Sequence, residues 1–280
     1  AATQRQVAFR VTASGADEIV SETTEACPPG ETALTLDMRG WKNGSYDVTV
    51  ELLEDGYCFF RDSFPAYRFP DSSAEGFRAT NIGVNTPQNE EDLRLLHEAG
   101  IRQIRVGFLW EYVEKEKGVY DFSELDAMMA LTRELNIETT ALLAYGNPLY
   151  YTETDATDKT ALSTDEQRRA FAAFAAAVVQ RYPDLAGVEI WNEPNAPGFW
   201  DGDMNDYMKL VKQTSAAIRK ANPFMPIYGG SIDISRFGTI GTTGKDGYRF
   251  MELMRESGLY ADIDGISFHP YFHPYVCENR

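Results

Sequence analysis

The sequence is poor in basic residues, cysteine and histidine, and the shortage of basic residues limits the possible partners most. Lys and Arg number 26 against 43 Asp and Glu, which gives a formal net charge of −17. A surface of this sign repels phosphate backbones and anionic lipids, so neither nucleic acid nor membrane is an expected partner. Neutral sugars are indifferent to such a field, and a carbohydrate remains possible as a ligand.

Long hydrophobic runs are also missing. No stretch approaches the ~20 apolar residues that a membrane-spanning helix needs. The sequence starts with Ala1-Ala2-Thr3, as a mature protein does after signal cleavage and as a trimmed chain does too. We expect a secreted or extracytoplasmic protein.

Only three cysteines and three histidines are present. Cys27 and Cys58 lie in one short β-rich segment and are predicted to pair, which would contribute ~3–4 kcal/mol through loop closure. The alternative is three reduced, buried thiols, with Cys277 unpaired in either case. His269 and His273 have no third ligand at a familiar spacing, so neither a metal nor another cofactor is expected.

Residues 1 to about 75 have the pattern of β-strands. Apolar residues alternate with polar or small ones at Val7, Phe9 and Val11, at Leu34, Leu36 and Met38, and at Val48, Val50 and Leu52. A period of two indicates half-buried strands, and Asn43-Gly44 is a hairpin signal between two of them. We therefore predict a small all-β sandwich over residues 1–75.

From residue 76 the pattern changes to repeated strand and helix. Apolar strand-like runs fall at 78–84, 101–107, 137–143, 187–191, 226–231 and 263–268. The helical stretches between them carry end signals, including a capping box over residues 164–167 and predicted C-terminal caps at Gly100 and Gly258. This alternation predicts a parallel sheet with right-handed crossovers.

Such a sheet either stays open, as in a doubly wound fold, or closes into a barrel. A doubly wound nucleotide-binding fold needs a glycine-rich turn after its first strand, but Gly83-Val84-Asn85-Thr86-Pro87 offers no phosphate cradle. We therefore predict an α/β fold with a (β/α)8 TIM barrel over residues 76–280, of which this chain holds six strands.

Functional side chains of a barrel lie where its strands end, because the loops that follow the strands converge at one rim. The predicted strand ends carry a series of polar and aromatic residues, namely Arg105, Trp110, Tyr145, Asn147, Asn192, Glu193, Ser231, Asp233, His269 and Tyr271. These are the candidates for a site.

The most specific motif is Val188-Glu189-Ile190-Trp191-Asn192-Glu193-Pro194-Asn195. Glycoside hydrolysis needs one carboxylic acid to protonate the leaving oxygen, and retention of configuration needs a second carboxylate about 5–5.5 Å away as nucleophile. Glu193 stands at a strand end before a stiffening proline, and Asn192 offers an amide for a sugar hydroxyl. The simpler alternative is that Glu193 caps the next helix.

These residues resemble the retaining clan of (β/α)8 glycosidases, and most closely family 39 of the glycoside hydrolases, which includes β-xylosidases and bacterial endoglycosidases that act on exopolysaccharide. The similarity spans about residues 77–275 and is strongest in the motif around Glu193. Phe199-Trp200 after that motif, the segment 108–122 and Phe268-His269-Pro270-Tyr271 also resemble the family. The resemblance implies Glu193 as acid/base and Asn192 as its partner amide, with Arg105, His269 and Tyr271 as supports near the nucleophile.

Other candidates have two interpretations. Trp110, Tyr145 and Trp200 either stack on sugar rings or pack between loops, and Asn147 is a further predicted substrate contact. Arg105 is alternatively a structural ion-pair residue inside the barrel. The acidic residues Glu111, Glu114 and Glu116 are most simply a solvated charged loop.

The resemblance places the nucleophile at the end of a seventh strand, whereas the sixth predicted strand ends at Phe268 and twelve residues follow it. A crossover alone takes about a dozen residues, so we expect a nucleophile outside this chain, on a further segment or a second chain that completes the barrel. Glu278 is the alternative nucleophile within it. The predicted activity is that of a retaining glycoside hydrolase; the alternatives are a non-catalytic carbohydrate-binding barrel and a transglycosidase.

Overall fold

The computed structural model describes most of the chain. The described residues are 5–13, 19–26, 37–38, 40–42, 44–68, 83–85, 89–152, 156–196, 198–233 and 247–270. Contacts divide the chain into two compact units, residues 1–78 with 98–100 and residues 79–97 with 101–280. The first unit thus ends close to residue 75, where the sequence pattern changes.

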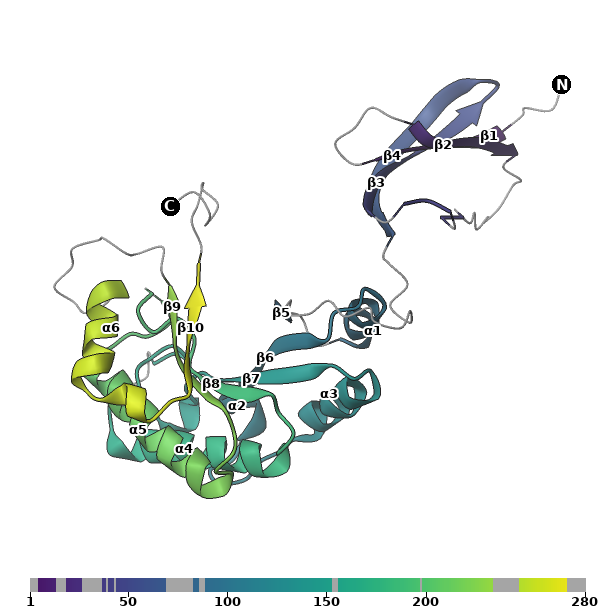
Figure 1. Ribbon diagram of the computed structural model, residues 1–280. Helices are drawn as coiled ribbons and strands as arrows, with labels where there is room; N and C mark the ends of the chain where they lie inside the picture. The colour runs from purple at the N-terminus through teal and green to yellow at the C-terminus, as the bar shows by residue number, and fades with distance from the viewer. Residues whose placement is uncertain are drawn as a thin grey trace. The chain divides into compact units, whose positions relative to one another are not determined.

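The first unit contains an antiparallel sheet of four strands in the order β2-β1-β3-β4 (Figure 1). Its strands are β1 (Arg5–Ala13), β2 (Ile19–Ala26), β3 (Gly44–Glu54) and β4 (Tyr57–Arg68). The turn between β3 and β4 is Asp55-Gly56, where both residues have positive φ, as a type I′ hairpin requires. The predicted hairpin residue Asn43 and the predicted strand residues Leu34 and Leu36 lie outside the described residues.

The two faces of this sheet differ as the alternation predicts. Val11, Tyr46 and Val48 are buried together on one face. The opposite face carries exposed ion pairs between neighbouring strands, such as Arg10 with Glu22. The all-β character of the N-terminal segment is therefore confirmed, and its described strands form one sheet.

The predicted disulfide is not formed by Cys58. In the described part of the chain this residue has an exposed, free thiol, which donates a hydrogen bond to the Phe60 carbonyl at 3.2 Å. Cys58 belongs to the edge strand β4, where the side chain faces solvent. Cys27 and Cys277 lie outside the described residues.

The second unit is built on a curled parallel sheet whose six strands follow the chain order (Figure 1). They are β5 (Gly83–Asn85), β6 (Gln103–Leu109), β7 (Glu138–Ala144), β8 (Gly187–Ile190), β9 (Ile227–Asp233) and β10 (Gly265–His269). Each of the six predicted strands is present within a few residues of its expected position. The parallel order confirms the partial barrel and excludes a doubly wound sheet, in which the strand order reverses.

Helices connect these strands, and most run between consecutive members of the sheet. They are α1 (Glu90–Glu98), α2 (Trp110–Val113), α3 (Ser123–Glu134), α4 (Asp165–Arg181), α5 (Met204–Ala221) and α6 (Gly247–Glu256), with short 3-10 turns at Pro148–Tyr150 and Leu259–Ala261. The predicted capping box is confirmed, since the Thr164 hydroxyl accepts from the Gln167 amide and the Gln167 side chain accepts from the Thr164 amide. No helix in the described ranges is both long and apolar enough to cross a membrane.

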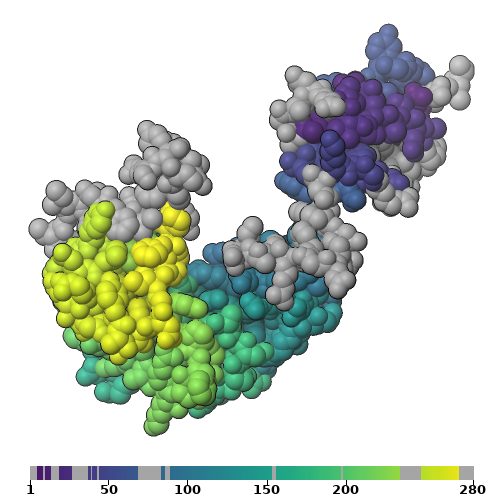
Figure 2. Space-filling view, viewed as in Figure 1, coloured from purple at the N-terminus to yellow at the C-terminus, as the bar shows by residue number. Residues whose placement is uncertain are grey.

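The sheet and its helices share one apolar core. On β6, Ile104, Val106 and Phe108 are buried in that core, and the Phe108 ring meets Tyr182 edge-on at 5.7 Å. Arg105 alternates with these residues and therefore lies on the opposite, barrel-interior face of the strand. Helices α5 and α6 contact each other. The green and yellow surfaces to which they belong adjoin in Figure 2. Polar side chains such as Arg105 and Glu189 meet on the inner face of the sheet.

Candidate active site

Glu193 lies just after β8 and is 8% exposed. Its φ is +46° and that of Trp191 is +67°, so two non-glycine residues of this turn adopt the left-handed conformation. That conformation costs about 1–3 kcal/mol per residue and persists only where surrounding contacts hold it, which is common at active sites. The local fold therefore holds Glu193 in a specific orientation.

His269 is the last residue of β10, and its side chain lies beside Glu193. Its Nδ1 lies 2.5 Å from Oε1 of Glu193, and both side chains are largely buried. Strand β9 separates β8 from β10, so this contact crosses the inner face of the curled sheet. His269, expected from the family resemblance as a support near the nucleophile, thus contacts Glu193.

Arg105 reaches the site from β6. Its Nη2 donates a hydrogen bond of 2.9 Å to Oδ1 of Asn192, and its Nε donates to a carboxylate oxygen of Glu189. The ion pair expected as the alternative for Arg105 is therefore present, and the same guanidinium contacts the residue next to Glu193. Its role near the nucleophile stays a prediction. Glu189 is only 2% exposed.

Tyr145 follows β7 and is half-buried beside the same residues. Its ring meets Trp191 edge-on at 5.4 Å, while the Lys159 ammonium lies 3.1 Å from the ring centroid. Burial raises the pKa of Tyr145 to about 12, against an opposing hydrogen bond from the Asn192 side chain. Tyr145 is therefore a neutral phenol at physiological pH, and Lys159 occupies space over its ring that a stacked sugar would need.

The side chains of Asn195 and Ser231 connect the end of β8 to β9. The side chain of Asn195 pairs with the backbone of Asp233, accepting from its amide at 3.0 Å and donating to its carbonyl at 2.9 Å. The Ser231 hydroxyl lies 2.7 Å from a carboxylate oxygen of Glu189 and 2.9 Å from the Trp191 carbonyl. These contacts hold the turn that carries Glu193.

Trp110 and Trp200 are both 0% exposed and pack within the protein, which is the second of the two environments expected for them. Trp110 stacks on Tyr150 at 4.9 Å, and Trp200 packs edge-on against Trp191 at the same distance. An indole of this size gains more from complete burial than from partial exposure at a rim, and each N–H has a partner within the protein.

The prediction for Asn147 is corrected. Asn147 is buried, and its side-chain amide donates to the Glu114 carbonyl at 2.7 Å and accepts from the Leu149 amide. It is an anchor between loops, with both polar atoms engaged. A sugar hydroxyl has no access to it.

Glu114 is likewise not part of a solvated loop, because it is completely buried. Its carboxylate accepts from the Trp110 indole at 2.5 Å, the Gly118 amide at 2.6 Å and the Tyr150 hydroxyl at 2.5 Å. Three donors offset the cost of burying the charge. Glu116, in contrast, is exposed as predicted.

Several predicted residues lie beyond what the structure describes. Tyr271, His273 and Glu278 fall within residues 271–280, outside the described residues. In the ranges that are described, no group of three or more His, Cys, Asp or Glu side chains is placed to hold a metal ion.

Glu189 and Lys159 are the two residues of the site that the motif analysis did not single out. For Glu189 a usable signal existed, since an acidic residue inside a four-residue strand that is buried throughout needs a partner. Lys159 had no such signal, because its position over Tyr145 depends on a loop between β7 and α4.

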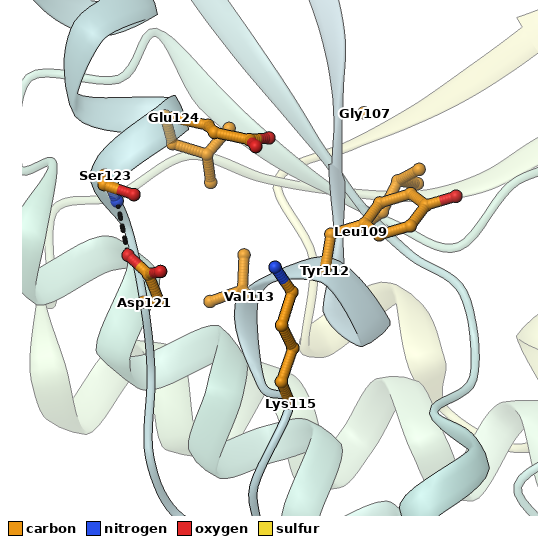
Figure 3. Close-up of a pocket in the computed structure, with 9 residues that line it drawn as sticks. Gly107, Leu109, Tyr112, Val113, Lys115, Asp121, Ser123 and Glu124 are labelled. Carbon is orange, nitrogen blue, oxygen red and sulfur yellow. Dashed lines mark hydrogen bonds between the residues drawn. The ribbon is translucent and has the colours of Figure 1, made fainter.

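A separate pocket of about 250 Å³ lies beside β6, α2 and the start of α3 (Figure 3). In the view of Figure 3, Lys115 and Glu124 extend toward it from two different elements. The lining residues are Gly107, Leu109, Tyr112, Val113, Lys115, Asp121, Ser123, Glu124 and Leu125. None of them belongs to the cluster around Glu193, so the pocket is distinct from the candidate site.

Most of the second unit matches a known family of glycosidases. The model of glycosyl hydrolases family 39 matches residues 79–273. The chain belongs to this family. The match covers the whole curled sheet and the motif around Glu193, and it confirms the resemblance found in the sequence.

Solved structures agree on the family 39 fold. A family 39 glycoside hydrolase from the gut symbiont Bacteroides cellulosilyticus WH2 is 21% identical with a TM-score of 0.71, over 98% of this chain and 53% of that one. A monomeric beta-xylosidase from Caulobacter crescentus CB15 is 21% identical with a TM-score of 0.52, over 68% of this chain and 41% of that one. The chain thus spans about half the length of these proteins or less, and at such identities the likeness concerns the fold.

Proposed function

We propose that this protein acts as a retaining O-glycosyl hydrolase on an oligo- or polysaccharide, with Glu193 as the acid/base. The observation that carries the proposal is the placement of the Glu193 carboxyl group at the strand-end rim of a family 39 barrel. There it contacts His269 and adjoins Asn192. Such a rim is where barrel enzymes carry their chemistry.

In the first step a carboxylate nucleophile attacks the anomeric carbon, the glycosidic C–O bond breaks, and the proton of Glu193 passes to the leaving oxygen. In the second step the Glu193 carboxylate takes a proton from water. The resulting hydroxyl displaces the enzyme carboxylate from the sugar and regenerates both groups. The proposal assigns the nucleophile to a residue outside the described ranges, about 5–5.5 Å from Glu193.

The test uses Glu193→Gln in the full-length protein with two aryl glycosides of one sugar. Turnover of the glycoside with the poorer leaving group should fall by about 10²–10⁴-fold, the range for general acid catalysis. Cleavage of a nitrophenyl glycoside should fall much less, since its leaving group needs little protonation. Azide can replace water in the second step, because it attacks the glycosyl enzyme without help from a base. Added azide should therefore restore turnover of the nitrophenyl substrate, with a glycosyl azide as the product.

Glu91→Gln is the matched control, because Glu91 is an exposed carboxylate on α1. It should leave both rates unchanged. Equal losses for the two substrates in Glu193→Gln would contradict the acid role. Binding of a glycan without any hydrolysis by the wild type would instead favour a carbohydrate-binding barrel, and inverted configuration of the first product would refute retention.

A further inference from the structure

We infer that Glu189 is a positioning residue for the reaction, acting on Asn192 through Arg105; this rests on the proposed function. Glu189 lies within β8 and is almost completely buried. One carboxylate oxygen accepts from Arg105 Nε, and the other lies 2.7 Å from the Ser231 hydroxyl. The carboxylate is thus held from both sides and in turn holds the guanidinium.

The guanidinium in turn orients the side chain of Asn192. Arg105 Nη2 donates to Oδ1 of Asn192 at 2.9 Å. An asparagine amide has two orientations of nearly equal shape that exchange its oxygen and nitrogen. Because a guanidinium only donates, it selects the orientation in which Oδ1 faces Arg105 and Nδ2 points away. Without that contact the amide loses the donor that selects this orientation.

The selected orientation matters for the chemistry of Glu193. Asn192 directly precedes Glu193 and retains 8% exposure. Its side chain also forms a hydrogen bond with Tyr145, and we expect the second hydrogen of Nδ2 to donate to a sugar hydroxyl next to the scissile bond. Hydrogen bonds to the sugar 2-hydroxyl strengthen in the transition state of glycoside hydrolysis. An amide fixed in the donating orientation therefore lowers the barrier, and a flipped amide does not.

Stability alone does not account for this arrangement. A buried ion pair is often no more stabilising than apolar residues of similar volume. The Arg105 side chain is 20% exposed and that of Glu189 only 2%, so the pair runs from the barrel interior to the partly exposed rim. The ion pair therefore connects a buried anchor to the residue beside the acid/base.

The test compares a glycoside with its 2-deoxy analogue in the full-length protein. Glu189→Gln should lower kcat on the parent glycoside by about tenfold, the value of one hydrogen bond of ~1.4 kcal/mol. Its KM should change little, because the contact strengthens in the transition state. The 2-deoxy analogue lacks the hydroxyl that Asn192 is expected to contact. On this analogue the kcat of Glu189→Gln should be close to the kcat of the wild type on the same analogue.

Ser231→Ala keeps the test decisive if Glu189→Gln folds poorly, and a double variant provides an independent comparison if it folds well. Ser231→Ala retains the ion pair and removes the other contact of Glu189, so it should cause a smaller loss with the same dependence on the 2-hydroxyl. Glu189→Gln combined with Asn192→Ala should be no slower than Asn192→Ala alone, since both act through one contact.

The inference would be overturned if Glu189→Gln lowered kcat by the same factor on both substrates. It would also be overturned if Glu189→Gln and Asn192→Ala lowered kcat independently, which would leave Glu189 a structural role only. The leaving-group test on Glu193→Gln is separate. If that test succeeds and the 2-deoxy test fails, only the positioning role is lost; if Glu193→Gln fails its own test, the proposed function is lost.

Discussion

The Nδ1 nitrogen of His269 lies 2.5 Å from Oε1 of Glu193, although the two residues are 76 positions apart in the chain. One follows β8 and the other ends β10, so the curl of the sheet creates the contact. A hydrogen bond at this distance favours the orientation of the carboxyl group in which Oε1 faces His269. It therefore positions the group that is proposed to transfer the proton.

Replacing His269 tests that relationship. His269→Ala should lower kcat by about 10–100-fold, because a hydrogen bond to an ionisable group contributes roughly 1.5–3 kcal/mol. His269→Asn places a donor near the position of Nδ1 and should recover part of the loss. Steady-state kinetics on one aryl glycoside provides the measurement, and identical rates for the two variants would contradict the role of Nδ1.

The buried carboxylate of Glu114 should be important for stability. Glu114→Ala leaves three donors without their acceptor, so the free energy of unfolding should fall by about 3–5 kcal/mol. Urea unfolding followed by tryptophan fluorescence measures this directly, since Trp110 is one of the donors. Glu116→Ala in the same loop is the control and should stay within about 0.5 kcal/mol of the wild type. Equal effects would show that Glu114 is not the anchor of this loop.

The stability of the second unit should depend on pH through Asp264. The Arg219 guanidinium, which donates to Asp264 at 2.5 Å, holds the pKa of that carboxyl below its ordinary value, and the Ile227 amide contributes in the same direction. A lowered folded-state pKa means that the carboxylate stabilises the fold above the unfolded pKa. This contribution is lost as the pH falls through the folded pKa.

Asp264→Asn should therefore be less stable than the wild type by a constant amount above about pH 5, and the gap should close as the pH falls below about 4. Arg219→Gln removes the same pair and should show the same convergence. Thermal unfolding at a series of pH values gives the two curves. A gap that widens toward acid would have the wrong sign and would refute the assignment.

Cys58 should react as a free thiol. Iodoacetamide added to the folded protein without reductant should label the peptide that contains Cys58, because its sulfur is exposed on an edge strand. Cys58→Ser should lower the number of rapidly reacting thiols by one. Recovery of that peptide cross-linked to the peptide of Cys27 would instead support the disulfide.

Much of the second unit follows from local pattern. The apolar period of each strand and the capping box at Thr164 depend on near neighbours in the chain, so the sequence alone was enough to predict them. The position of Glu193 is also local, since it depends on where β8 ends. Asn192 is its direct neighbour and was found for the same reason.

Residue type was not enough where a side chain had two possible environments. Trp110 and Trp200 follow strand ends, and their sequence positions fit both a sugar platform and a core. Glu114 sits among other acidic residues, and its burial with three hydrogen-bond donors distinguishes it from Glu116. Part of the deciding environment comes from distant residues, such as Tyr150, which stacks on Trp110 and donates to Glu114.

By itself, the sequence determined the βα order, the family and the position of the proposed acid/base, because each depends on consecutive residues. Tertiary structure decided the contacts of Glu189 and His269. The links from Arg105 to Glu189 and from His269 to Glu193 span 84 and 76 positions. Distances across a curled sheet depend on its curvature and register, which no local pattern encodes.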